Sequence, residues 1–252
     1  MTDLLSLDIV TDTPFADGVP FGDTGAYRLI TGRALLAIGP DQIGADGMYQ
    51  ADRIETDAQG RIRAEADVFL MTPADPAKGN GTLLFEFINR GNKRALQFFN
   101  MGAPGNTPRT AADAGDGWLM SQGYTLCVVA WQGDVLRGDG RMTCRLPGYI
   151  DDTPTRITAE FIVEDDRTRF LPLSTKTGTR SYPAGSTDTN KAKLTRRRFP
   201  DSAREVIAPD AWAFERIDGD ASGLGAGDVM AAEQAIVPCP SHIHLFDGFR
   251  PG

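Results

Sequence analysis

Two polar loops, each following an apolar segment, hold the residues best suited to chemistry. "NRGNK", Asn89 to Lys93, follows the apolar residues 82–88, and "WQGD", residues 131–134, ends the apolar run 124–131. Cations can hold a substrate anion, a carboxylate can orient a neighbouring group, and a glycine lets the backbone approach a ligand closely. Both loops are therefore candidates for a ligand site.

The two apolar segments predict buried strands, and a helix-containing connection joins them. Such a connection favours a right-handed crossover and therefore a parallel pair. Because the carboxyl ends of parallel strands lie at one edge of a sheet, we expect the two loops to lie close together.

Other elements are predicted from periodicity and turn residues. Residues 27–38 suggest two strands broken at Gly32, and residues 60–73 alternate before they become fully apolar, which is typical of a strand that enters a sheet at an edge. The turn-rich residues 73–81 predict a hairpin connection. Short helical turns are expected in 94–102 and 116–123, the second closed by Gly123.

Strand patterns return after residue 150. Residues 156–165 alternate, residues 210–217 form a further candidate strand, and the basic run 191–198 predicts a solvated or salt-bridging surface. The expected fold class is α/β with a mixed, partly parallel and incomplete sheet. We divide the chain into a β-rich segment, 1–80, and a first part of the core with an irregular β insertion, 81–252.

Composition narrows the classes of function. The 252 residues are 41% hydrophobic and 24% charged, with a net charge of −8, so a nucleic-acid partner is not expected. No apolar run reaches the roughly 18 residues that span a bilayer, and no basic segment precedes the amino-terminal apolar stretch. With three cysteines in no recognisable pattern, a cytoplasmic chain without a membrane association is expected.

The loop motifs resemble those of α/β-hydrolase-domain proteins, large esterase-like chains in which one strand ends in Asn-Arg-Gly-Asn-Lys and a Gly-Tyr strand ends in Trp-Gln-Gly-Asp. The matching stretches are 87–94 and 116–135, and weaker similarities bring the likeness to nearly the whole chain: 21–34, 193–198, 210–216 and 242–252. The resemblance implies an α/β-hydrolase core behind a β-rich front segment. It also implies a serine nucleophile on a strand-to-helix elbow, followed by an acid and a histidine.

The sequence departs from that pattern because it has no G-x-S-x-G. The resemblance therefore implies an amino-terminal portion, inactive alone, whose nucleophile lies in a missing carboxyl-terminal part or in another subunit. In this fold, a loop after a central strand donates a backbone N–H to the oxyanion. The resemblance makes Arg90, Gly91 and Asn92 oxyanion candidates. Candidate contacts to a small ester-like substrate are Asn89, Lys93, Trp131, Gln132 and Asp134.

Less specific interpretations stay open. Gly91 could serve only a turn, Trp131 could cap the core, and Asp134 could accept backbone hydrogen bonds. No serine stands in a strand-elbow-helix context, and the G-L-G-A-G stretch at 223–227 does not follow a buried strand. The candidate metal ligands near the end of the sequence have no clear distant partner, so neither metal nor cofactor is expected: Cys239, His242, His244 and Asp247. The alternative function is a non-catalytic β-rich module that binds a small anionic ligand or a protein partner.

Overall fold

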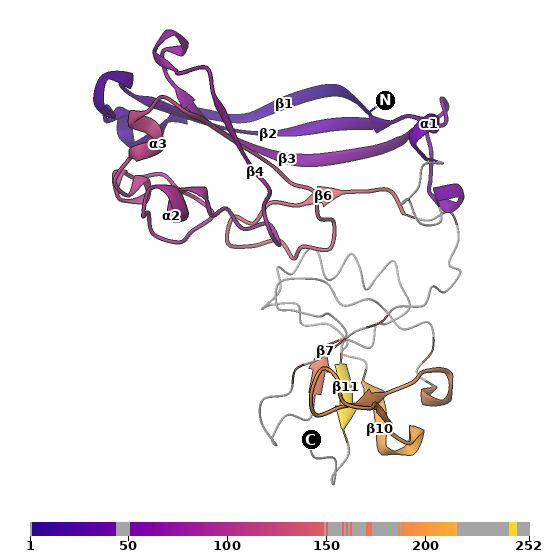
Figure 1. The fold of residues 1–252 in the computed structure, drawn as a ribbon. Coiled ribbons are helices and arrows are strands. Elements are labelled where there is room, and N and C mark those ends of the chain that lie inside the picture. The colour runs from indigo at the N-terminus through magenta and orange to yellow at the C-terminus, as the bar shows by residue number, and fades with distance from the viewer. Residues whose placement is uncertain are drawn as a thin grey trace. The chain divides into compact units, whose positions relative to one another are not determined.

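The computed structural model describes residues 2–43, 51–148, 150, 158, 160, 162, 170–172, 186, 188–215 and 242–245. The chain forms two compact units, residues 1–152 and 153–252 (Figure 1). The segments 1–80 and 81–252 that we separated by sequence both contribute strands to the sheet of the first unit.

The first unit is built on a mixed sheet. Its strands are β1 (Thr2–Pro14), β2 (Tyr27–Ile38), β3 (Ile62–Pro73), β4 (Leu83–Glu86), β5 (Thr125–Val129) and β6 (Cys144–Arg145). The order is β1-β2-β3-β5-β4, and β6 also pairs with β3. Neighbouring strands are antiparallel from β1 to β5, whereas β5 and β4 are parallel. The expected mixed, partly parallel sheet is confirmed.

The predicted break at Gly32 is wrong, because β2 continues through this residue and pairs with β3 along its whole length. The glycine serves a close approach between strands instead. A Cβ atom at position 32 would lie 2.7 Å from the carbonyl oxygen of Asp8, beside the register shift that follows Ile9 in β1. Glycine therefore allows the backbone of β1 to approach β2 closely at this irregularity, without interrupting β2.

The predicted hairpin at residues 73–81 is also wrong. β3 and β4 are consecutive in the chain, but β5 lies between them in the sheet. The connection contains a 3₁₀ helix, η4 (Pro76–Lys78), and the Asp75 carboxylate accepts a hydrogen bond from the Ala77 N–H at 3.0 Å. The turn residues were identified correctly, but turn chemistry does not reveal which strand becomes the neighbour.

The helices of the first unit are short. They are α1 (Pro40–Ile43), α2 (Ala95–Phe99), α3 (Trp118–Ser121) and the 3₁₀ helices η1 (Phe15–Gly18), η2 (Gly22–Thr24), η3 (Ala51–Arg53), η4 and η5 (Ala111–Ala114). Both predicted helical turns, α2 and α3, are confirmed, and Gly123 follows α3 with a φ of 76°. Within the described ranges, no helix combines the length and apolarity that a membrane crossing requires.

The core lies between one face of the sheet and helices α2 and α3. Buried side chains of β2, β3 and β5 meet those of the two helices there: Tyr27, Phe69, Met71, Leu126, Val128, Ala95, Leu119 and Met120. The hydroxyl of Tyr27 lies 2.8 Å from the carbonyl oxygen of Tyr124 and 3.1 Å from that of Met120. Burial raises the pKa of Tyr27 to about 12, so this phenol remains a donor at neutral pH.

The second unit contains small sheets. β7 (Phe170–Pro172), β11 (His242–Leu245) and β10 (Trp212–Glu215) form one, and β8 (Thr195–Arg196) and β9 (Glu205–Val206) form another. Its described 3₁₀ helices are η6 (Thr189–Lys191) and η7 (Pro209–Ala211). The strand predicted at 210–217 is confirmed as β10, whereas most of 156–165 lies outside the described residues.

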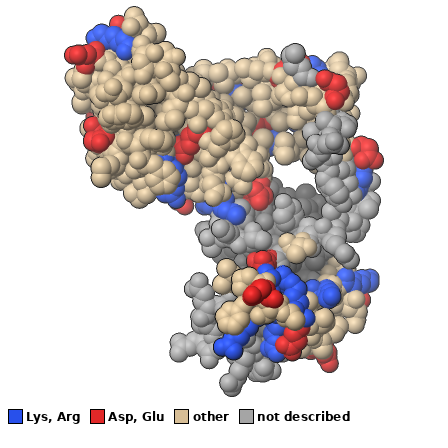
Figure 2. Space-filling view, viewed as in Figure 1, with Lys and Arg blue, Asp and Glu red and all other residues tan. Residues whose placement is uncertain are grey.

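Two arginines of the basic run 191–198 form ion pairs, in line with the predicted solvated or salt-bridging surface. Arg196 pairs with Glu205 at 2.8 Å, and Arg197 pairs with Glu160 at 2.6 Å. Figure 2 shows the blue and red side chains of this unit next to one another. The hydrogen bond and charge of Arg197 lower the pKa of Glu160. These cations are therefore neutralised within the unit.

Candidate functional site

The polar loops that follow β4 and β5 meet at one edge of the sheet. The two strands pair in parallel, with Phe85 opposite Cys127 and Glu86 opposite Val128. The Arg90 N–H donates to Oε1 of Gln132, and the indole N–H of Trp131 donates to the carbonyl of Ile88 at 2.7 Å. The prediction that the two loops lie close together is confirmed.

The first loop is a tight turn with two left-handed residues. Arg90 has a φ of 54° and Gly91 a φ of 74°, and the Asn92 N–H donates to the Asn89 carbonyl at 3.1 Å. Positive φ at both central positions is the signature of a type I′ turn. Gly91 is also packed tightly, because a Cβ atom there would lie 2.5 Å from the Met142 carbonyl oxygen. Glycine is therefore required at position 91 for two reasons, the positive φ of the turn and the close packing against the Met142 backbone.

The second loop, residues 131–134, is bound through Gln132 to the turn after β4 and to residues 143–144. The carbonyl of Gln132 accepts hydrogen bonds from the Cys144 N–H at 3.0 Å and from the Thr143 hydroxyl at 3.3 Å. The Thr143 N–H in turn donates to the Asp67 carboxylate of β3 at 2.9 Å. Gln132 thus joins the turn after β4 to the segment that precedes β6, while Asp134 is half-buried nearby in sequence.

Two of the three backbone donors predicted for an oxyanion are used inside the loops. The Arg90 N–H is bound to the Gln132 side chain, and the Asn92 N–H closes the turn. The Gly91 N–H has no hydrogen-bond partner among the described residues. Gly91 is itself buried, so its N–H is the one unpaired donor of the three and the oxyanion role stays a prediction.

Lys93 connects three separate parts of the first unit. Its amine donates to the carbonyls of Asn106 at 2.8 Å and Gly140 at 3.1 Å, and it lies 5.0 Å from the centre of the Phe69 ring. Burial lowers the pKa of Lys93 to about 8, while the Glu86 and Asp67 carboxylates act in the opposite direction. A lysine with a lowered pKa beside a cavity is typical of a functional site, although structural lysines share this property.

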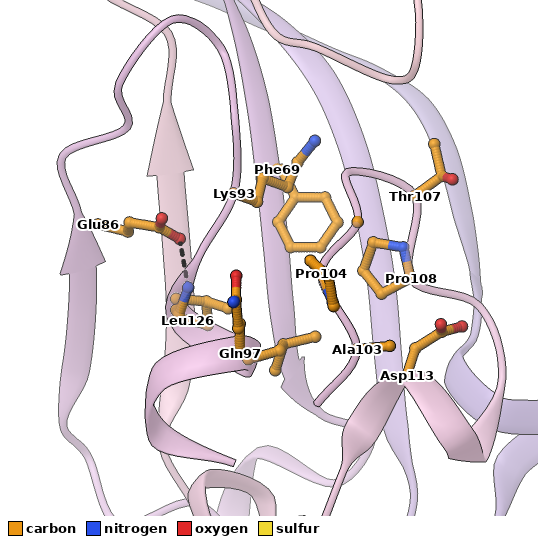
Figure 3. A pocket seen from close by; sticks show the side chains of 13 residues that line it. Phe69, Glu86, Lys93, Gln97, Ala103, Pro104, Thr107, Pro108, Asp113 and Leu126 are labelled. Atoms are coloured by element: carbon orange, nitrogen blue, oxygen red, sulfur yellow. Dashed lines mark hydrogen bonds between the residues drawn. The ribbon is translucent and has the colours of Figure 1, made fainter. Parts of the chain in front are cut away.

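Lys93 also lines a cavity of about 230 Å³ next to α2. In Figure 3, Glu86 and Gln97 lie on one side of the Phe69 ring, and Thr107, Pro108 and Asp113 lie on the other. Lys93 is the one predicted site residue that borders this cavity. The other lining residues are Phe69, Glu86, Ala95, Leu96, Gln97, Ala103, Pro104, Gly105, Thr107, Pro108, Asp113 and Leu126.

The two carboxylates of the cavity are engaged at helix starts. Glu86 accepts hydrogen bonds from the N–H groups of Arg94 and Ala95 and so holds the first turn of α2 against β4. Asp113 accepts from the N–H groups of Arg109 and Thr110, both at 2.8 Å, and these bonds lower its pKa. Both side chains are therefore acceptors already in use. The Gln97 Oε1 also accepts a hydrogen bond, from Arg94 at 2.9 Å, so the donors left for a ligand are the third N–H of the Lys93 ammonium group and the Gln97 amide N–H groups.

The pH dependence of stability tests the burial of Lys93. Between pH 8 and 10.5 the folded protein has released the lysine proton while the unfolded chain keeps it, so unfolding takes up a proton and stability rises with pH. We expect the stability of the wild type relative to Lys93→Met to rise by about 2 kcal/mol between pH 7.5 and 10 in urea unfolding.

Comparing the two proteins removes the contributions of groups that titrate in the same range. Burial raises the pKa values of Tyr27, Cys127 and Cys144, so these groups lower stability as pH rises, equally in both proteins. If the difference in free energy of unfolding between wild type and Lys93→Met stayed constant from pH 7.5 to 10, the pKa of Lys93 would not be lowered by burial.

The remaining candidates from the sequence belong to other described elements or lie outside the described residues. Ser121 lies in α3 and its hydroxyl donates to the Trp118 carbonyl at 2.9 Å, whereas Ser186 accepts from the Asp188 N–H at 3.1 Å. His242 and His244 belong to β11, and Ser241, Cys239, Asp247 and residues 223–227 lie outside the described residues. In the part of the chain that the structure covers, no three histidine, cysteine or carboxylate side chains gather as a metal site would require.

Sequence reasoning missed Glu86, Gln97, Thr107 and Asp113. A carboxylate inside the apolar segment 82–88 was the available signal for Glu86, because a charged residue there needs a partner. Gln97 stands in the helical turn predicted at 94–102, whereas Thr107 and Asp113 stand in loop-like sequence. Only the folding of 95–113 against β3 brings the three together.

Comparison of the chain with protein-family models, with curated proteins and with solved structures finds no match. The resemblance to α/β-hydrolase-domain proteins therefore stays a prediction.

Proposed function

We propose that this chain is the amino-terminal portion of a serine-hydrolase-like α/β protein that cleaves small ester-like substrates in the cytoplasm. In this proposal the chain supplies the oxyanion loop and the substrate-binding loops, while the serine nucleophile comes from a segment or subunit outside residues 1–252. The chain alone is then inactive.

The observation that carries the proposal is the meeting of the loops after two parallel strands. In α/β proteins, ligand sites form at the carboxyl ends of parallel strands. The turn there contains Gly91, whose N–H has no partner in the described part of the chain and can be donated to a substrate oxygen. Lys93 and the adjoining cavity provide a cation and apolar walls for an acyl group.

The edge position of β4 favours a further strand that pairs beside it in the complete protein. β4 stands last in the order of the sheet, and its side chains Leu83 and Phe85 are exposed. A parallel edge strand with apolar side chains is typical of a sheet that continues. In an α/β-hydrolase the nucleophile follows a sheet strand, and a further strand beside β4 would bring it near the Gly91 turn.

A second candidate function is the binding of a small anionic ligand without catalysis. The observation that favours it is the Arg90 side chain, whose Nε is buried without a hydrogen-bond partner among the described residues. A buried cationic donor without an acceptor is costly, and an anion at this position would satisfy it. Arg90 and Lys93 lie three residues apart on the same loop, so both cations could contact such a ligand.

A fluorophosphonate probe separates the two functions. The tagged chain, purified under native conditions from its own source, is treated with the probe, and labelled peptides are identified by mass spectrometry. We expect a labelled serine in co-purified polypeptide outside residues 1–252 and no label within them. A labelled serine inside the chain would contradict the missing nucleophile, and the absence of any specific label would favour the anion-binding function.

A further inference from the structure

The cavity beside α2 is bordered by a cation that has no counter-ion in the described part of the chain. Lys93 is half-buried, and its ammonium group donates to the carbonyl oxygens of Asn106 and Gly140. Neither acceptor is charged, and Lys93 forms no ion pair among the described residues. Withdrawing a cation from water is costly unless an anion compensates its charge. One N–H of the ammonium group remains for such an anion.

The walls around this cation are largely apolar. They include Phe69, Leu96, Pro104, Pro108 and Leu126. Figure 3 shows the Phe69 ring between the polar side chains on its two sides. Aromatic rings pack well against one another in offset or edge-to-face arrangements, and a rigid ring loses less conformational freedom on binding than a flexible chain. The walls therefore favour a ligand with an aromatic ring.

The volume of the cavity limits the ligand to about nine non-hydrogen atoms. An apolar cavity of about 150 Å³ binds benzene, which corresponds to about 25 Å³ for each carbon atom. The cavity beside α2 has a volume of about 230 Å³. At the same density it holds one aromatic ring and about three further atoms, which is the size of a ring with one carboxylate group.

Two carboxylates on the cavity wall restrict the charge of the ligand. Glu86 and Asp113 each accept hydrogen bonds from two backbone N–H groups. These bonds stabilise the two negative charges without a ligand cation, but the charges repel a second anionic group. A phosphate dianion or a dicarboxylate is therefore disfavoured, whereas a single carboxylate can pair with Lys93.

We propose that this cavity binds a small aromatic monocarboxylate of the size of benzoate, with its carboxylate on the Lys93 ammonium group and its ring against Phe69. The inference rests on the assignment of Lys93 and the cavity to a ligand site, which both functions proposed above share. It adds the class of acid. In the serine-hydrolase function this acid is the acyl part of the ester, and in the anion-binding function it is the ligand itself.

Ligand-observed NMR titration of benzoate with the full chain tests this proposal. We expect a dissociation constant below about 1 mM at pH 7, since about nine atoms in a largely formed cavity support this affinity. Benzamide has the same shape without the charge, and terephthalate has a second carboxylate. Both are expected to bind at least about tenfold more weakly than benzoate. 2-Naphthoate has a second fused ring that exceeds the volume, and we expect no binding.

Lys93→Met removes the charge and keeps the length of the side chain. We expect it to weaken benzoate binding at least about tenfold and to change benzamide binding by no more than about twofold. The matched control is Lys78→Met, which removes the same charge at an exposed position of η4 and is expected to bind benzoate like the wild type. Circular-dichroism melting verifies that both variants are folded.

The pH dependence of binding tests the Lys93 charge in the wild type, without any variant. Burial lowers the pKa of Lys93 to about 8, so the ammonium form is lost above this pH while benzoate keeps its charge. Linkage then weakens benzoate binding about 30-fold between pH 7 and 9.5, whereas benzamide binding is expected to stay constant. The other charged groups around the site keep their charge over this range: Asp67, Glu86, Asp113, Asp139 and Arg141.

Failure of this inference and failure of the serine-hydrolase function give different results. No binding at 5 mM benzoate, or equal affinities for benzoate and benzamide, would overturn the inference even where the fluorophosphonate probe labels a serine outside residues 1–252. Tighter binding of hexanoate than of benzoate would overturn the aromatic class. Equal affinities at pH 7 and 9.5, or equal effects of Lys93→Met and Lys78→Met, would remove Lys93 from the site and so also overturn the inference. Benzoate binding with the expected charge and pH dependence supports it, whether or not a serine is labelled.

Discussion

Gly91→Ala is expected to lower the free energy of unfolding of the first unit by about 3 kcal/mol, the sum of a backbone cost and a packing cost. At a φ of 74°, an L-residue pays about 1–2 kcal/mol. The added methyl group would stand 2.5 Å from the Met142 carbonyl oxygen and 2.9 Å from its nitrogen. Backbone atoms cannot rotate away as a flexible side chain can, so the turn or the segment around Met142 has to move.

Urea unfolding followed by tryptophan fluorescence measures this effect, and Trp131, one of the three tryptophans, lies close to the site. The matched control is Gly105→Ala, because a Cβ atom at this cavity-lining glycine meets nothing within 4 Å. We expect the control to change stability by about 0.5 kcal/mol or less. If both variants unfold at the same urea concentration, the tight contact between the Gly91 turn and Met142 does not exist.

The second large effect is expected at Asn100, a fully buried amide at the end of α2. Its Nδ2 donates to the Ala114 carbonyl at 3.0 Å, and its Oδ1 accepts from the Leu119 N–H at 2.9 Å. Asn100→Ala leaves the Leu119 N–H without its Asn100 acceptor, whereas the Ala114 carbonyl keeps a hydrogen bond from the Gly117 N–H at 3.1 Å. At about 1–3 kcal/mol for the unsatisfied buried donor and about 1 kcal/mol for the second lost bond, we expect a loss of about 3 kcal/mol in the free energy of unfolding.

Asn80 is the natural control for this prediction. Its side chain makes the same two kinds of bond, donating to the Gln122 carbonyl and accepting from the Thr82 N–H, but it is exposed. Water can replace these bonds, so Asn80→Ala should cost about 1 kcal/mol or less. Similar losses in the two variants, measured by urea unfolding, would show that Asn100 is not the buried connection between α2 and α3.

Asn100 also shows why parts of the site could not be read from the sequence. It stands in "FFNMG", next to two exposed phenylalanines, and nothing local marks it as the most buried polar side chain of the region. Its burial follows from contacts with residues 114 and 119, which are separated from it by a loop. A short helix such as α2 is positioned by such distant partners, because its own turns contribute little stability.

The parallel pair and its loops, in contrast, were determined by the sequence. Two apolar runs joined by a helix-containing crossover can bury their side chains and satisfy chain connectivity as neighbouring parallel strands. This arrangement places the residues after Glu86 and after Val129 at one edge of the sheet. Alternation likewise determined β3, and Gly123 marked the end of α3 because its left-handed conformation closes the helix.

Only the tertiary structure decided which strand lies between β3 and β4, and which side chains meet at the cavity. β5 lies between β3 and β4 because of long-range strand pairing. The turn residues at 73–81 are compatible with either neighbour and do not determine this pairing. The convergence of Glu86, Lys93 and Asp113 depends on three segments folding over β3. Local patterns record the propensity and the buried face of each segment, whereas the choice among compatible partners is made by packing the whole unit.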